Sequence, residues 1–383
     1  MQVPTPVKKI VDVLGLRFCI QRFLFNLKRN RSENADSAYF LENKKVTKLR
    51  AGRPIDLLVV TPWADPNRHL WEIAGGNYFF EIFHSAKEYF ANKKIENIRI
   101  GYGDSDWKYN LLGAIRNSNP KNILIQVESD PDGSGDWTID SFAQMLKKIG
   151  WNGRFFLLTY DSVFPLHMFR IDRVTRIFRK SVVISIDRYC RGYYRARVPN
   201  IGPAFLPLSE ATLLAIQDYF QVIDNEWTRE LGRKFTFVGA EYDYRRVALT
   251  AIRDTGLELS INPQNRGSEQ ASYLKYALAL HSSLATLNFS RAHVIDVAQV
   301  KSRVIEAMLF QCVLVTDEGS ILEKFFEPGV DFLTYSSPEE LLRIYQNLLS
   351  DKNKVEHMKK NAFDRAIKVN KSSFWGEFEK LMD

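Results

Sequence analysis

The chain has few cysteines and no long apolar run, and both absences exclude classes of protein. Its three cysteines, Cys19, Cys190 and Cys312, lie far apart, and their odd number and spacing predict neither a disulfide framework nor a zinc site. The longest stretch without a formal charge, residues 276–290, has 15 residues, whereas a membrane-spanning helix needs about 20 apolar residues. No transmembrane helix is therefore predicted.

A secretory signal and internal repeats are also missing. Asp12, Arg17 and Arg22 interrupt every apolar run near the N-terminus that could form the core of a signal peptide. The lack of a repeat excludes solenoids and propellers. We therefore expect a cytoplasmic protein.

The composition that remains is that of a globular protein with a basic charge. The 383 residues predict two domains, or three, and the 45% apolar and 26% charged residues suffice for a sizeable core. The chain has 53 basic and 45 acidic residues, a net charge of +8, which favours anionic partners such as nucleotides, lipid head groups or nucleic acid.

Residues 1–50 differ from the rest of the chain. Within residues 7–30, Ile10, Val13, Leu14 and Phe18 recur at helical spacing, while lysines and arginines occupy other positions. This pattern predicts a basic amphipathic helix, which either packs on the main body or attaches to an anionic membrane surface. Residues 31–53 resemble a polar linker.

From residue 55 onward, short β-branched runs alternate with amphipathic helical stretches, as in parallel βαβ units. The expected strands are 55–61, 98–103, 123–128, 155–160 and 182–186, then 235–238, 259–262, 285–289, 313–316 and 332–335, with helices such as 244–254 and 302–310 between them. The proline-rich segment 198–207 indicates an interdomain connection. We predict two α/β domains at 51–203 and 204–365, facing each other across a cleft, and a C-terminal helix at 366–383.

Ligands of such sheets bind beyond the carboxyl ends of the strands, so residues just after each strand are candidates. Gly75 and Gly76 lie at the expected start of a helix, where exposed N–H groups favour a phosphate. Gly239 ends a strand, and Arg245 or Arg246 in the next helix could reach a diphosphate. The alternative for either arginine is a solvated surface position.

A second cluster of candidates surrounds the helix predicted at 302–310. Asn288 follows a strand, and Lys301, Arg303 and Glu306 lie near the start of the helix. A carboxylate at Glu306 could accept both hydroxyls of a ribose, while Lys301 and Arg303 neutralise the attached phosphates. The structural alternative is that Glu306 only stabilises the helix macrodipole.

These residues carry a resemblance to a known family. Residues 287–318, the following 325–367 and the preceding FVGAEYDYRR at 237–246 resemble the C-terminal donor-binding domain of GT-B glycosyltransferases, especially the CgeB-like, spore-maturation branch of the group 1 superfamily. The final residues, 370–383, resemble the terminal helix that crosses back to the first domain of that fold. The resemblance implies two Rossmann-like, doubly wound domains, here with an N-terminal helical extension.

The resemblance also implies a reaction. It predicts sugar transfer from a nucleotide-diphosphate sugar, held mainly by the second domain, to a glycan, lipid-linked or cell-surface polysaccharide acceptor, with no cofactor and no metal. The net charge and residues 7–30 suggest an acceptor at the inner face of a membrane. An inverting enzyme needs a general base, for which Asp161, followed by Asp65 and His69, is the candidate. In a retaining enzyme the departing phosphate itself takes the proton.

The chain departs from the family pattern at two positions. Group 1 enzymes carry two glutamates separated by seven residues; Glu306 matches the second, but Ala298 stands at the first, where Asp296 or Gln299 could substitute. Gln311 stands where a glycine is usual. These departures leave open a binding or scaffold protein without turnover.

Two further possibilities concern metals and nucleic acid. Asp130, Asp132 and Asp136 could bind a cation, but an acidic turn is the favoured interpretation. The same fold can glycosylate DNA bases, and the positive charge is compatible with phosphate contacts. Because the basic residues are dispersed and no nucleic-acid motif is present, a nucleic-acid partner is not expected.

Overall fold

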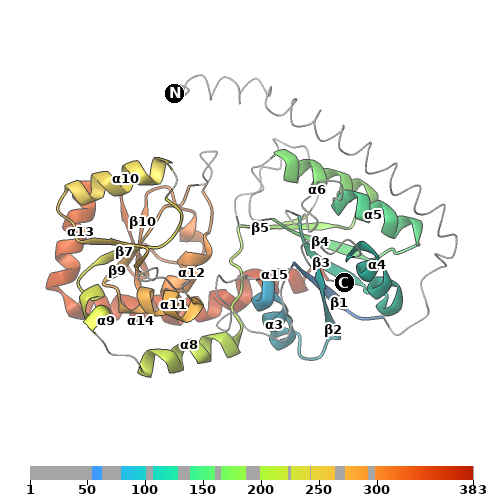
Figure 1. Cartoon of the computed structure of the whole chain (residues 1–383), viewed down its shortest axis with the longest axis horizontal. Coiled ribbons are helices and arrows are strands. Elements are labelled where there is room, and N and C mark those ends of the chain that lie inside the picture. The colour runs from blue at the N-terminus through green and yellow to red at the C-terminus, as the bar shows by residue number, and fades with distance from the viewer. Residues whose placement is uncertain are drawn as a thin grey trace, which may run out of the picture.

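The computed structural model shows two α/β domains side by side (Figure 1). The structure describes residues 54–62, 79–100, 107–127, 139–159, 165–186, 199–222, 226–241, 243–263, 272–291 and 298–382. The helix predicted within residues 7–30 lies outside these segments.

The N-terminal domain is built on a parallel six-stranded sheet of order β2-β1-β3-β4-β5-β6. The strands are β1 (Leu57–Pro62), β2 (Ile95–Ile100), β3 (Asn122–Gln126), β4 (Arg154–Thr159), β5 (Val182–Ser185) and β6 (Asn200–Ile201); the helices are α3 (Phe79–Tyr89), α4 (Trp107–Ser118), α5 (Ile139–Lys148) and α6 (Pro165–Ile177). Central strands buried on both faces explain the continuous apolar runs in the sequence.

Each face of this sheet has its own core because successive side chains of a strand point to opposite sides. Leu58, Val60 and Phe155 pack with residues of α4, α5 and α6. Leu57 and Phe156 pack on the other face, with α3 and with residues from the C-terminal end of the chain. The N-terminal domain is therefore completed by the end of the polypeptide.

The C-terminal domain has a parallel five-stranded sheet of order β11-β10-β9-β7-β8. The strands are β7 (Phe235–Phe237), β8 (Leu259–Ile261), β9 (Ala285–Asn288), β10 (Val313–Asp317) and β11 (Phe332–Tyr335). The helices are α8 (Glu210–Val222), α9 (Glu226–Leu231), α10 (Asp243–Asp254), α11 (Tyr273–Ser282), α12 (Ser302–Leu309), α13 (Pro338–Ser350) and α14 (Lys352–Lys371), with a 3₁₀ turn at Leu322–Lys324. The ten strands predicted from the sequence are present, and β6 is an additional short edge strand.

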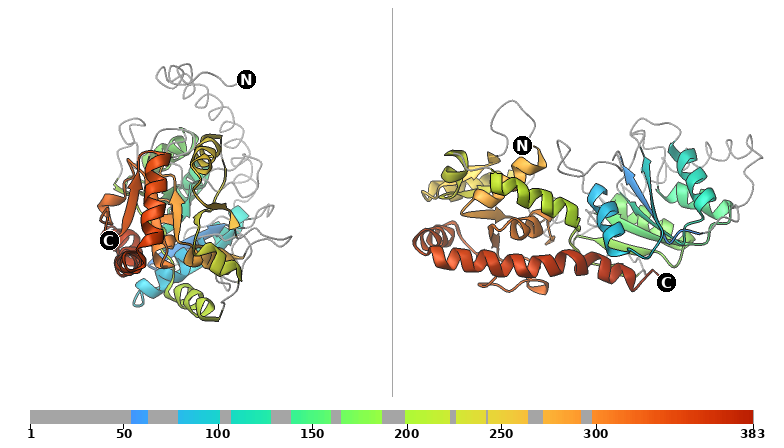
Figure 2. Two further views of the ribbon diagram at one scale, coloured as in Figure 1. Left: turned by 90° about the vertical axis from the view of Figure 1, so that its left-hand side faces the viewer. Right: turned by 90° about the horizontal axis from the view of Figure 1, so that it is seen from below.

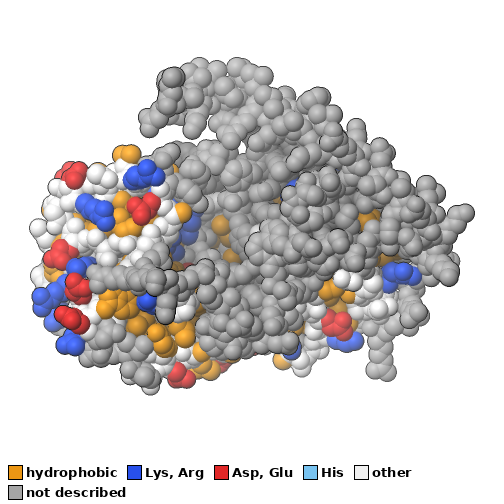
Figure 3. Space-filling view, viewed as in Figure 1, with side chains coloured by type: hydrophobic (Ala, Val, Ile, Leu, Met, Phe, Trp, Pro, Cys, Tyr) orange, Lys and Arg blue, Asp and Glu red, His pale blue; other side chains and the backbone are white. Residues whose placement is uncertain are grey.

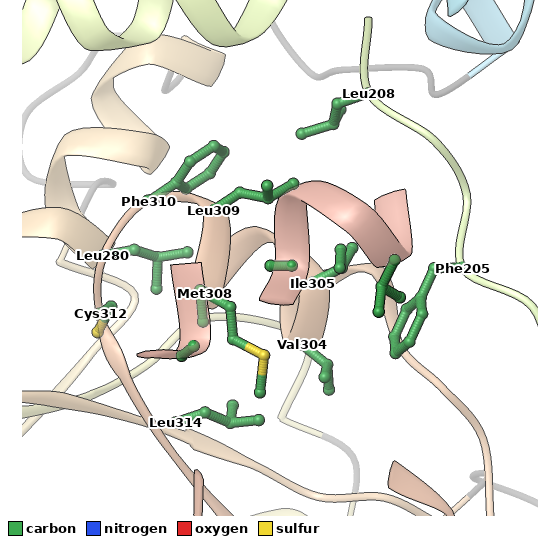
Figure 4. Close-up of a cluster of buried hydrophobic side chains, with 14 of the residues drawn as sticks. Phe205, Leu208, Leu280, Val304, Ile305, Met308, Leu309, Phe310, Cys312 and Leu314 are labelled. Carbon is green, nitrogen blue, oxygen red and sulfur yellow. The ribbon is translucent and has the colours of Figure 1, made fainter. Parts of the chain in front are cut away.

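Helix α12 is fixed by its apolar side. Figure 4 shows the buried cluster around it, which includes Val304, Ile305, Met308 and Leu309 of the helix, Leu280 of α11, Leu314 of β10, and Phe205 and Leu208 of the interdomain segment. Each of these large side chains contributes roughly 1.5–3 kcal/mol by leaving water. This packing sets the rotation of α12 and with it the direction of its polar side chains.

The two domains are joined at buried polar contacts. Glu81 of α3 is fully buried and accepts hydrogen bonds from Ser209 N (2.8 Å), Ser209 Oγ (2.7 Å) and Thr212 Oγ1 (2.7 Å) at the start of α8. A carboxylate at a helix N-terminus is stabilised by the helix dipole. Between the domains, Val300 N also donates to Ile186 O at 2.7 Å.

The C-terminal segment crosses between the domains. In the right-hand view of Figure 2, helix α14 runs along the lower edge of the C-terminal domain, and the segment after it ends beneath the N-terminal domain. Near its end, Asn370 accepts from Leu208 N (2.9 Å) and donates to Leu208 O (2.8 Å), which holds the two crossing segments together. Beyond it, a π-helical turn (Ser372–Gly376) and α15 (Glu377–Glu379) place Trp375 and Phe378 in the core of the N-terminal domain.

The predicted fold class, two Rossmann-like parallel-sheet domains, is confirmed. In each sheet the strand order reverses beside the first strand, between β1 and β3 in one domain and between β7 and β9 in the other. Ligands of open α/β sheets bind at this switch point, outside the carboxyl ends of the strands. The segments after β1 and β3 lie outside the described residues, whereas residues 238–241 and 289–291, after β7 and β9, are described.

Candidate functional site

Gly239, two residues after the end of β7, lies in contact with Arg303 of α12. The φ angle of Gly239 is 146°, in the region that favours glycine, and a Cβ at this position would collide with Nη2 of Arg303. The side chain of Asn262, after β8, holds the same peptide: Gly239 N donates to Oδ1 (2.8 Å) and Nδ2 donates to Gly239 O (3.2 Å). The structure thus brings together two residues that the sequence singled out separately.

Arg245 lies next to Arg303, and both guanidinium groups are beside the ring of Phe237 in β7. Their central carbons are 6.0 Å and 5.0 Å from the ring centroid. Arg245 is 5% exposed and donates from Nε to Tyr244 Oη (2.9 Å) and from Nη1 to Ala240 O (3.1 Å). Burial, and then the like charge of Arg245, lower the pKa of Arg303.

Arg246 takes a different position. Its side chain is exposed, and Nη2 donates to Glu241 O at 3.4 Å. Of the two adjacent arginines proposed for a diphosphate, Arg245 is the one beside Arg303. Two converging guanidinium groups at the end of a strand are suited to a phosphate group, which accepts paired N–H donors.

Glu306 is buried one turn further along α12. The residue is 2% exposed. Its Oε1 accepts a hydrogen bond from Tyr273 Oη (2.5 Å), and its Oε2 accepts one from Tyr276 Oη (2.7 Å). Burial raises the pKa of this carboxyl well above its usual value. Each oxygen accepts one tyrosine hydroxyl. The ribose contact expected at this carboxyl group stays a prediction.

Lys301, Gln299 and Asn288 complete the described candidates. Lys301 precedes the first residue of α12, and its Nζ donates to Gln299 Oε1. Asn288 is fully buried and donates from Nδ2 to Thr316 Oγ1 at 3.0 Å. Within the described residues, Asn288 Oδ1 and Ser290 Oγ are buried polar atoms without a hydrogen-bond partner, which leaves acceptor capacity at the end of β9.

Several predicted site residues lie outside the described segments. They are Asp65, His69, Gly75, Gly76, Asp161 and Asp296, together with Asp130, Asp132 and Asp136. Among the residues that are described, no group of three or more His, Cys, Asp or Glu side chains could hold a metal ion. The helices of the described segments include none that is long and apolar enough to cross a membrane.

The sequence reasoning missed Asn262, Tyr273 and Tyr276. The two tyrosines are three residues apart on α11, a spacing that places both on one side of a helix. That pattern was visible, but their partner Glu306 lies 33 and 30 residues further along the chain. Only the packing of α11 on α12 brings them together.

Comparison with known proteins bears on the fold and on one segment of the chain. Residues 222–372 match the family described as glycosyl transferase-like. No curated protein matches the chain. The fold resembles that of solved GT-B glycosyltransferases, so the chain has the GT-B fold.

Three of these structures illustrate the likeness. Sucrose-phosphate synthase from Thermosynechococcus elongatus is 10% identical, with a TM-score of 0.52, covering 86% of this chain and 99% of its own. Anabaena HepE in complex with UDP is 11% identical, with a TM-score of 0.52, covering 85% and 99%. A DNA-modifying β-glucosyltransferase is 13% identical, with a TM-score of 0.54, covering 85% and 99%.

Proposed function

We propose that the chain is a glycosyltransferase that takes a sugar from a nucleoside-diphosphate sugar. The observation that carries this proposal is the convergence of Arg245 and Arg303 beside Phe237 at the end of β7, with Arg303 against Gly239, at the switch point of a domain that matches the glycosyl transferase-like family. Departure of a nucleoside diphosphate develops negative charge, and preorganised cations stabilise that charge in the transition state. Further support comes from the solved neighbour HepE, which holds UDP. Residues 237–246 and 287–318 favour the CgeB-like branch.

The other donor contacts follow from the same site. Lys301 and Asn288 lie at the carboxyl edge of the sheet, and Gly75 and Gly76 are proposed to approach the phosphates from the N-terminal domain. Guanidinium and ammonium groups supply the positive charge that a metal would otherwise supply, so we propose metal-independent transfer without a cofactor.

The acceptor is proposed to bind at the switch point of the N-terminal domain. If the reaction inverts configuration, Asp161, Asp65 or His69 takes the proton of the acceptor hydroxyl; if it retains configuration, the departing phosphate does so. We propose a glycan or lipid-linked acceptor of polysaccharide biosynthesis, reached through peripheral attachment of residues 7–30 to an anionic membrane. Liposome sedimentation with and without residues 1–30 tests the attachment, and equal binding would refute it.

A DNA acceptor is the second candidate, because one solved neighbour is a DNA-modifying glucosyltransferase. On the face shown in Figure 3, the described lysines and arginines of the C-terminal domain are intermingled with acidic side chains and form no single basic stripe. A nucleic-acid surface typically gathers its basic residues on one face. A steep loss of duplex binding with increasing salt would favour this candidate.

Turnover distinguishes the enzyme from a scaffold that has kept the fold. Full-length protein is incubated with UDP-, ADP-, GDP- and dTDP-glucose, and release of the nucleoside diphosphate is followed. We expect release with one nucleotide family, and a loss of at least about 100-fold in Arg303→Ala, as for removal of a charged transition-state contact. Binding without any release or transfer would instead support the scaffold suggested by Ala298 and Gln311.

A further inference from the structure

Tyr276 of α11 lies beside two side chains of α12, Arg303 and Glu306. Its hydroxyl donates to Oε2 of Glu306 at 2.7 Å, while Tyr273, one turn earlier on α11, donates to Oε1 at 2.5 Å. Tyr273 is 6% exposed, whereas Tyr276 is partly exposed. The two hydroxyls therefore contact the same carboxyl group from different depths.

Arg303 lies three residues before Glu306 on the same side of α12, and the Tyr276 hydroxyl is close enough to its guanidinium group for the two to interact. Among the described residues, Nε of Arg303 is buried and has no hydrogen-bond partner, and the Tyr276 hydroxyl is a polar group next to its guanidinium group. The guanidinium group lies over Phe237 and against Gly239, neither of which provides a directional contact for its N–H groups. Tyr276 thus fixes the direction of a side chain that the ring and the glycine only confine.

The chemistry of a phenol explains why Glu306 matters for this contact. A tyrosine hydroxyl has one proton and two acceptor lone pairs. The Tyr276 proton is directed to Oε2 of Glu306, which accepts it as a carboxylate oxygen or, when the carboxyl group keeps its own proton on Oε1, as a carbonyl oxygen. A lone pair of the phenol is therefore left for the guanidinium group. This arrangement also opposes the repulsion between Arg303 and its like-charged neighbour Arg245.

We propose that Tyr276 is a positioning residue that holds the Arg303 guanidinium group in place for the donor diphosphate, with Glu306 orienting the Tyr276 hydroxyl. This inference rests on the proposed donor site. Glu306 then affects donor binding indirectly, through Tyr276 and Arg303.

The test compares Tyr276→Phe with Tyr273→Phe in the full-length chain. Each variant removes one hydroxyl from the same carboxyl group, but only the first removes the contact with Arg303. Affinities for UDP, ADP, GDP and dTDP, and for the matching nucleosides, are measured by isothermal titration calorimetry. For the diphosphate that binds, we expect Tyr276→Phe to weaken affinity about ten-fold, as for a lost hydrogen bond to a charged group. Its nucleoside affinity, and both affinities of Tyr273→Phe, should stay within about two-fold.

A double-mutant cycle separates positioning from a general structural effect. In an Arg303→Ala background, Tyr276→Phe should cause no further loss of diphosphate affinity. If Tyr276→Phe does not fold, Glu306→Leu should lose about ten-fold in diphosphate affinity and Glu306→Gln, which keeps an acceptor oxygen, should lose less. The nucleoside affinity of both variants should stay unchanged, which a lost ribose contact would not allow.

Equal losses in the two tyrosine variants, or an undiminished loss in the Arg303→Ala background, would overturn the positioning role and leave the donor site intact. Equal affinities of Glu306→Gln and Glu306→Leu would do the same. If the unmodified chain binds none of the four nucleoside diphosphates, both the inference and the proposed function are overturned.

Discussion

At the scale of single residues, Gly239 is required for two independent reasons. Its φ angle of 146° is strained for any residue with a Cβ, and that Cβ would collide with Arg303. Gly256 has a similar backbone demand, with φ of 86°, but no atom would lie near its Cβ. Comparing alanine variants of the two glycines therefore distinguishes the effect of backbone strain from the effect of displacing Arg303.

We predict that Gly239→Ala destabilises the fold by about 2–3 kcal/mol through strain and overpacking, and weakens nucleoside-diphosphate binding about ten-fold. Gly256→Ala should cost about 1–2 kcal/mol from backbone strain and leave binding unchanged. Urea denaturation and calorimetric titration of both variants check this. Unchanged binding in Gly239→Ala would show that the position of Arg303 does not matter.

The buried carboxyl of Glu306 predicts a pH dependence of stability. Its pKa is raised in the folded state, so above the unfolded value the unfolded chain releases the proton while the folded chain keeps it. Stability is therefore lost as pH rises from about 4.5 toward the folded pKa, by up to about 1.4 kcal/mol per pH unit. Glu306→Gln removes this titration. Urea denaturation at pH 5 and pH 8 measures the free energy of unfolding of the variant relative to that of the unmodified chain. This difference should shift in favour of the variant at pH 8; a difference that is the same at both pH values would contradict the raised pKa.

How far the sequence predicts the site depends on the distance between partners. Gly239, Arg245 and Arg303 were identifiable because each follows or begins an element at a predictable edge of the sheet. The choice of Arg245 over Arg246 was not, because a one-residue step turns a side chain by about 100° around the helix. The tyrosine contacts of Glu306 depend on the packing of α11 against α12, which no local pattern encodes.

At the scale of elements, the apolar runs predicted the presence of each strand better than its first and last residues. Strand β2 begins at Ile95, three residues before the predicted segment 98–103; the predicted segment starts late because the polar Glu96 and Asn97 interrupt the apolar pattern. Strand β6 has two residues and lies within the predicted interdomain connection. An edge strand this short has too few side chains to produce a pattern.

The C-terminus of α12 offers a test at this scale. Gln311 follows the C-cap residue Phe310, is exposed, and has φ of 56°, the left-handed conformation that glycine usually adopts after a helix. We predict that Gln311→Gly stabilises the fold by about 0.5–1 kcal/mol, because relief of strain exceeds the added freedom of the unfolded chain. Gln311→Ala, which keeps the Cβ, should give no gain. Denaturant midpoints of the two variants check this, and equal midpoints would contradict the strain.

At the scale of the whole molecule, the domains depend on each other through the segments that cross between them. Trp375 and Phe378 complete the N-terminal core from the far end of the chain, and Trp375 Nε1 donates to Ser85 Oγ at 3.0 Å. Asn370 and Glu81 supply the buried hydrogen bonds at the crossing. The C-terminal residues therefore contribute to both the stability of the first domain and the position of the second.

We predict that Asn370→Ala destabilises the protein by about 2–4 kcal/mol, because it leaves the buried N–H and C=O of Leu208 without partners. Asn361→Ala, on the same helix in an open groove, should change stability by less than about 0.5 kcal/mol. Thermal and urea unfolding monitored by tryptophan fluorescence measure both. Similar small effects would show that the crossing segments are not held by Asn370.

The most direct test of the donor site is calorimetric titration of the full-length chain with UDP, ADP, GDP and dTDP, comparing Arg245→Ala with Arg246→Ala. The two arginines are adjacent in sequence, but only Arg245 lies beside Arg303 at the end of β7. The donor site predicts that Arg245→Ala weakens binding of one nucleoside diphosphate at least about ten-fold, as for a lost charge-assisted hydrogen bond, while Arg246→Ala stays within about two-fold. Equal affinities of the two variants, or no binding by the unmodified chain, would contradict it.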